Sequence, residues 1–300
     1  MRNRFHFSPL AAIAATALAG SVLAGCSSEG NDASDSDMIA TTNVWADVAS
    51  AVTGEDVDAI ITGDAVDPHH YEPSAKDLSR IKGADTVVAN GGAYDAALYT
   101  AAEQDRIIYA IPLLDEHEAH EHDHDHDHML DSLDELEHAW FAPEKVLQVA
   151  EDIADRSGGD ASDVKQRIGE IQSKLNAVPH VHIGMTETIA AGLVWGTELH
   201  DITPEEYVKA SLNHQEPSAS AVAAFLEQIE RGELDMLFVN PQSTNSATQR
   251  LADAAKAHNV PVVEIRETPP AGQNFLDYFQ EIVGQITDIA AHAEPTDHHH

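Results

Sequence analysis

Cysteine and basic residues are scarce in this 300-residue chain, and both shortages limit what it can do. Cys26 is the single cysteine, which excludes a disulfide within the chain and a metal site built from several thiolates. Only 16 Lys and Arg stand against 52 Asp and Glu, for a formal net charge of -36. Such a negative charge repels nucleic acid and anionic lipid surfaces. We therefore exclude nucleic-acid binding.

Long apolar runs are also missing after the N-terminal segment, so nothing later in the sequence is suited to span a bilayer. Residues 1–25 have the pattern of a signal peptide, with Arg2 and Arg4 before an alanine-rich apolar run. The ending Leu23-Ala24-Gly25-Cys26 resembles a bacterial lipobox, which predicts a lipid on Cys26; an ordinary secretory signal and a single membrane anchor are the alternatives. Residues 26–37 are polar and predict a flexible tether, placing the protein on the extracytoplasmic side of the cell membrane.

From residue 38 onward, short β-branched runs alternate with helix-like segments, which predicts an α/β fold with parallel sheets flanked by helices. We expect two similar lobes, residues 38–143 and 179–294, joined by a helical connector at 144–178 that residues 157–160 interrupt, with a tail at 295–300. The expected strands are 39–42, 57–62, 86–89, 106–111, 181–186, 235–239 and 260–265. The expected helices are 45–52, 74–81, 94–103, 146–154, 164–175 and 247–258. Ligands of such sheets gather at the carboxyl ends of the strands.

Histidines occur at positions suited to holding a metal ion. The loop 66–73 carries His69 and His70 between two prolines, directly after an expected strand, although a solvated loop would have the same composition. His138 stands beside Trp140 and Phe141 before a proline-started helix, where packing could hold its ring; a core histidine is the alternative.

Residues 115–128 are the most biased segment, because histidines alternate with carboxylates and cannot form a packed core. Imidazole suits zinc, copper and nickel, so this loop is predicted to collect such ions weakly, unless it is only a solvating acidic insert. Its histidines are His117, His120, His122, His124, His126 and His128. The letters of residues 120–124 match the H-E-x-x-H pattern of zinc proteases, but an alternating Asp-His run lacks the apolar helix face which that motif requires.

In combination these motifs resemble the metal-specific (zinc and manganese) solute-binding lipoproteins of ABC transporters, over essentially the whole mature length. Residues 67–73 match the family's Asp-Pro-His-x-Tyr-Glu-Pro loop, which implies His69 rather than His70 as a ligand. The biased loop 115–128 falls where the family has its His-rich loop, and 138–140 matches its His-x-Trp segment, which implies His138 as the second ligand. The opening 41–47 is also similar.

The resemblance further implies two ligands from the second lobe. Glu187, at the end of a strand, takes the place of the family's third ligand, where zinc-type members more often carry His. Glu267 takes the place of the fourth, usually Asp, and has a surface salt bridge with Arg266 as its alternative. His180 and His182, at the start of the same strand as Glu187, are interpreted as structural.

These ligands would close around one divalent ion in a cleft between the lobes and leave no position for a reacting substrate. We therefore expect no enzyme but a monomeric protein that captures a metal ion and delivers it to an ABC permease. The six-histidine loop favours Zn2+, and Mn2+ is the alternative. A metal-buffering or adhesin lipoprotein and, with less support, a metallohydrolase are the other possibilities.

Overall fold

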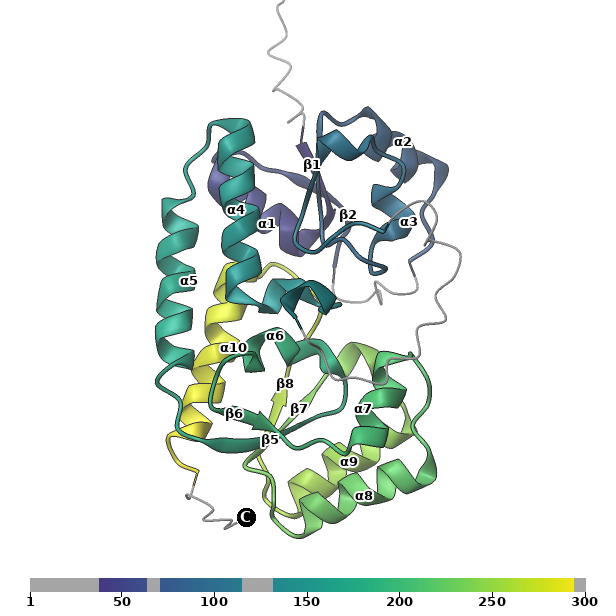
Figure 1. The fold of residues 1–300 in the computed structure, drawn as a ribbon, viewed down its shortest axis with the longest axis vertical. Helices are drawn as coiled ribbons and strands as arrows, with labels where there is room; N and C mark the ends of the chain where they lie inside the picture. Colours follow the sequence, from purple (N-terminus) through teal and green to yellow (C-terminus); the bar gives the residue numbers. More distant parts are fainter. Residues whose placement is uncertain (1–37, 64–70, 115–131, 294–300) are drawn as a thin grey trace, which may run out of the picture. The chain divides into compact units, whose positions relative to one another are not determined.

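The computed structural model describes residues 38–63, 71–114 and 132–293. Two four-stranded sheets organise the chain, each wholly parallel, with the orders β2-β1-β3-β4 and β6-β5-β7-β8 (Figure 1). The first sheet contains β1 (Met38–Thr42), β2 (Asp58–Ile61), β3 (Thr86–Ala89) and β4 (Ile107–Tyr109). The second contains β5 (Val181–Met185), β6 (Leu199–Asp201), β7 (Met236–Val239) and β8 (Val262–Glu264). The matching orders make the two lobes topological repeats, which confirms the predicted two-lobed α/β fold.

Helices connect and flank these strands. The longer ones are α1 (Asn43–Thr53), α2 (Ala75–Gly83), α4 (Pro143–Ser157), α5 (Ser162–Leu175), α7 (Glu205–Leu212), α8 (Ala219–Glu230), α9 (Ser246–Ala257) and α10 (Phe275–Ala290). Single turns form α3 (Ala96–Tyr99), α6 (Ala191–Val194), η2 (Gln104–Arg106), η3 (Leu133–Glu135), η4 (Ala139–Phe141), η5 (Thr188–Ala190) and η6 (Pro241–Ser243). No helix in the described part of the chain combines the length and the apolar character that crossing a membrane requires.

Local sequence explains where several helices begin and end. Ser74 caps α2 through a capping box with Asp77, which satisfies two backbone N–H groups that the first turn leaves without partners. Gly158, in the left-handed conformation, ends α4, and α5 then starts at Ser162 and packs against α4. The connecting segment therefore consists of two helices, with the break in the region where the sequence predicted an interruption.

The expected helix 94–103 is wrong in length, since only Ala96–Tyr99 is helical. The carboxylate of Asp95, which stands at the cap position, does not cap the turn. It accepts hydrogen bonds instead from the backbone N–H groups of Asn90 and Gly91 and from the Thr41 hydroxyl, at 2.7, 3.0 and 2.6 Å. This buried carboxylate serves the loop after β3 rather than a helix.

Gly91 is required in that loop. Its φ is +91°, and a Cβ built there would lie 2.1 Å from the backbone oxygen of Ile111. No side chain fits such an approach, so the loop can pass directly against the chain that follows β4.

The lobes share one hydrophobic core built largely on α1, α4, α5 and α10. In Figure 1 the yellow α10 lies beside the teal α5, which in turn packs against α4. The first turn of α10 is tied to α1, because the Phe275 N–H donates to the Asp47 carboxylate at 2.7 Å. The C-terminal helix thus returns to the first lobe, an element that the sequence analysis did not predict.

Candidate metal site

His138 is the component of the site that comes from the first lobe. It lies just before η4 and is 2 % exposed. Its ring meets Trp140 edge to face at a centroid distance of 5.3 Å and Tyr94 at 5.7 Å. The segment before it is fixed where the Asn90 side-chain amide donates to the backbone oxygen of Glu137 at 2.8 Å. Packing therefore holds the imidazole in one position.

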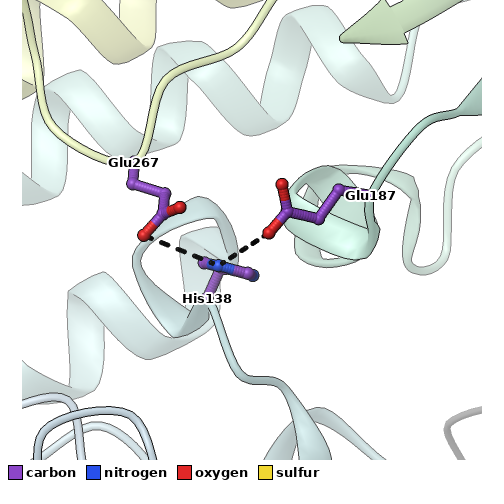
Figure 2. Close-up of side chains that lie close together, drawn as sticks. All are labelled: His138, Glu187 and Glu267. Carbon is purple, nitrogen blue, oxygen red and sulfur yellow. Dashed lines mark ion pairs between the residues drawn. The ribbon is translucent and has the colours of Figure 1, made fainter. Parts of the chain in front are cut away.

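Two carboxylates of the second lobe face this imidazole. Glu187 follows β5 and Glu267 follows β8, so both stand at the carboxyl ends of strands in the same parallel sheet. One oxygen of each lies 4.0 Å from the His138 Nε2 (Figure 2). Glu267 is only 1 % exposed, which does not fit the alternative of a surface salt bridge.

Asn240, directly after β7, connects the two carboxylates. Its side-chain N–H group donates to Glu187 Oε2 at 2.8 Å and to Glu267 Oε1 at 3.0 Å, and the residue is fully buried. Each carboxylate has a further donor, because the Ser243 hydroxyl donates to Glu187 and the Tyr94 hydroxyl donates to Glu267 Oε2 at 3.0 Å. These bonds orient the carboxylates toward His138.

No role in the site was predicted for Asn240, Ser243 or Tyr94. One available signal is the repeat between the lobes: Asn90 follows β3 and Asn240 follows the equivalent strand β7, and both are buried asparagines. Polar residues at the ends of central parallel strands are candidates for ligand sites. Tyr94 gives no comparable signal, since only folding brings it to a residue 173 positions away.

Burial shapes the protonation of the groups around the site. It raises the pKa of the Tyr94 hydroxyl well above its usual value, and the neighbouring Glu267 carboxylate raises it further. Tyr94 therefore keeps its proton and remains a donor at neutral pH. Burial also raises the pKa of Asp95 to about 6, although hydrogen bonds from Thr41, Asn90 and Gly91 act to lower it.

The donor atoms of His138, Glu187 and Glu267 all lie within 4.8 Å of one another. Two carboxylate charges at such a separation repel each other by about 3 kcal/mol at an effective dielectric constant of about 20. A divalent cation between them would turn this repulsion into attraction, and one imidazole with two carboxylates suits a borderline or hard divalent metal. The arrangement can thus hold a cation, with ligands from both lobes.

A pocket of about 270 Å³ borders the site on the side of the second lobe and includes Glu187 and Ser243 in its wall. His214 also lines it, and its Nε2 lies 3.2 Å from a Glu137 carboxylate oxygen of the first lobe. His214 is thus placed beside the site, next to the Glu137 carboxylate, rather than in the group around His138. The pocket leads from the surface to Glu187.

The other predicted site residues lie outside the described residues. They are His69, the loop histidines His117, His120, His122, His124, His126 and His128, and the lipidation site Cys26. Three of the four expected metal ligands are therefore described, and the structure brings all three together.

In this two-lobed α/β protein, donors that converge at the ends of parallel strands could hold a small cation. The chain belongs to the ZnuA family, described as zinc-uptake complex component A, periplasmic, whose model matches residues 38–289. It is therefore a metal-binding periplasmic solute-binding protein and not an enzyme. A comparison with curated protein sequences returned no match.

Solved structures share this fold at low sequence identity. The periplasmic zinc-binding protein TroA from Treponema pallidum is 16 % identical with a TM-score of 0.60, over 85 % of this chain and 98 % of that one. The Zn(II)-bound ZnuA-like domain of Streptococcus pneumoniae AdcA is 17 % identical with a TM-score of 0.55, over 84 % and 98 %. The laminin-binding protein Lmb of Streptococcus agalactiae is 16 % identical with a TM-score of 0.59, also over 84 % and 98 %.

Proposed function

We propose that this protein captures Zn2+ outside the cytoplasm and delivers it to an ABC permease for uptake. The proposal depends on one observation, the convergence of His138 with Glu187 and Glu267 from opposite lobes within 4.8 Å. Membership of a family of zinc-uptake components supports the metal and its direction of transport. The zinc-bound relative with this fold is consistent with it.

The complete ligand set that we propose is His69, His138, Glu187 and Glu267. Two imidazoles and two carboxylates would fill a four-coordinate shell around zinc without leaving a position for water to react. Such a site stores and releases an ion. Because the ligands come from both lobes, residues 38–143 and 179–294 with the connector 144–178, the bound ion would hold the lobes together in a form that a permease can distinguish.

We further propose that a lipid on Cys26 anchors the protein to the extracytoplasmic face of the cell membrane and that residues 26–37 act as its tether. A monomer suffices for this role, since one chain supplies all four ligands. The histidine-rich loop 115–128 would raise the local concentration of zinc near the site, because isolated imidazoles among carboxylates bind borderline metals weakly.

Competition between metals tests the proposal. The purified chain is dialysed against equal concentrations of Zn2+ and Mn2+, and bound metal is counted by elemental analysis, with and without residues 115–128. We expect the zinc held by His138, Glu187 and Glu267 to survive deletion of the loop, since imidazole and Irving-Williams ordering both favour zinc over manganese. The His138→Ala chain should lose this ion, whereas His258→Ala, a control on the exposed end of α9, should keep it.

If the protein retains manganese tightly in the presence of zinc, the transported ion is manganese, and the proposed ligands remain the same. Zinc bound equally well by the His138→Ala chain and by its control would refute the site itself.

A further inference from the structure

A second group of histidines lies at the opposite end of the second sheet from the site described above. His180 immediately precedes β5, His182 is the second residue of β5, and His200 lies on the neighbouring strand β6. Their ring centroids are separated by 5.3 Å between His180 and His182, and by 5.6 Å from each of these to His200. The three rings therefore form one compact cluster.

The register of the sheet builds this cluster. His182 and His200 are paired residues of adjacent parallel strands, so their side chains point to the same face about 4.8 Å apart. His180 is two residues before His182, and the alternation of side chains along extended backbone directs it to that face as well. Val181 and Ile183 point the other way, into the core. Three imidazoles thus share one face because of backbone geometry.

The surroundings suit metal ligation rather than packing. The ring of His182, which is half-buried, makes a hydrogen bond with the backbone of Glu233, the kind of contact that orients a ligating imidazole through its other nitrogen. The Glu198 carboxylate lies 3.4 Å from His180 Nδ1 and adds a negative charge at the rim.

We propose that His180, His182 and His200 form a second binding site for a borderline divalent metal ion such as Zn2+, Cu2+ or Ni2+. Three imidazoles with water in the remaining position are a ligand set that these ions accept. His182 and Glu187 are five residues apart along the same strand and its end, about 16 Å, so the two sites bind separate ions.

Binding of an ion at the second site requires the rings to turn toward one another, because their centroids lie 5.3–5.6 Å apart. Among the residues that the structure describes, the group formed by His138, Glu187 and Glu267 is the one whose donor atoms already lie within 4.8 Å of one another. His180 and His200 are exposed, so their rings can turn toward the half-buried His182 without disturbing the core. The rings of the second site become ordered only when the ion binds, which costs free energy. We therefore expect the second site to bind its ion less tightly than the site at His138.

Zinc stoichiometry tests the proposal in a chain whose other histidine clusters are removed. In this background the six histidines of the loop 115–128 and the three at 298–300 are replaced by serine. Equilibrium dialysis followed by elemental analysis should then give two zinc ions per chain. His200→Gln should lower the number to one, and His180→Gln should do the same. His258→Gln, an exposed histidine outside both sites, should leave it at two.

Loss of the first site is measured separately. Glu267→Gln in the same background should remove the other ion and leave the one held by the histidine cluster. If His200→Gln and His180→Gln both bind as much zinc as His258→Gln, the second site does not exist, whatever happens at Glu267. Circular dichroism and the thermal midpoint of each variant confirm that the exposed substitutions leave the fold intact.

Discussion

Replacing Asn240 by alanine removes the side chain that connects the two carboxylates of the proposed zinc site. The amide donates to Glu187 at 2.8 Å and to Glu267 at 3.0 Å from a fully buried position. A hydrogen bond to a charged group contributes about 1.5–3 kcal/mol. Since Ser243 and Tyr94 still donate to the same carboxylates, the lower value applies to each bond. The free energy of unfolding in a chelator should therefore fall by about 3 kcal/mol.

In saturating zinc the loss should be larger. Residues that orient metal ligands typically contribute a factor of about 10–100 to affinity. By linkage, this weaker binding subtracts a further 1.4–2.8 kcal/mol or so from the stability of the zinc-bound protein. Guanidinium unfolding of the Asn240→Ala chain, in chelator and in zinc, measures both quantities.

Asn245→Ala is the matched control, because Asn245 caps α9 and does not touch either carboxylate in the contacts described. It should cost about 1 kcal/mol equally in chelator and in zinc. Equal losses for Asn240→Ala under the two conditions would refute the argument that Asn240 orients metal ligands.

Two further predictions concern charge. Glu267→Gln should weaken zinc binding by at least about 100-fold, the upper value for residues that only orient ligands, whereas Glu264→Gln, exposed at the end of β8, should have no effect in the same titration. Asp95 has its pKa raised from 3.8 to about 6 by burial, so the folded state binds this proton more tightly than the unfolded state. Its contribution to stability is therefore present below about pH 4 and is lost as the pH rises through 6, by about 3 kcal/mol. Denaturant unfolding of metal-free protein from pH 4 to 7 should show this loss, and Asp95→Asn should remove it; an unchanged pH profile would contradict the assignment.

Local patterns in the sequence were enough to predict much of the fold. Alternating β-branched runs and amphipathic segments indicated parallel sheets, Ser74 marked the start of α2, and the glycines after residue 157 marked the break between α4 and α5. Each of these features depends on residues that are close together in the sequence, so the sequence is enough to predict it. The edge strand β6 was not predicted. Its three residues, Leu199–Asp201, are too few to show the alternation of apolar and polar side chains that indicates a strand.

The sequence by itself determined which residue types are present to bind a cation, and the resemblance of their spacing to a known family selected His138, Glu187 and Glu267. Tertiary structure decided that donors from two lobes converge within 4.8 Å and that Asn240 links the carboxylates. It also decided the cluster around His182, because the register between β5 and β6 places His200 beside it. These contacts join residues distant in the chain, and their positions are set by how the sheets and the shared core pack, which no local pattern encodes.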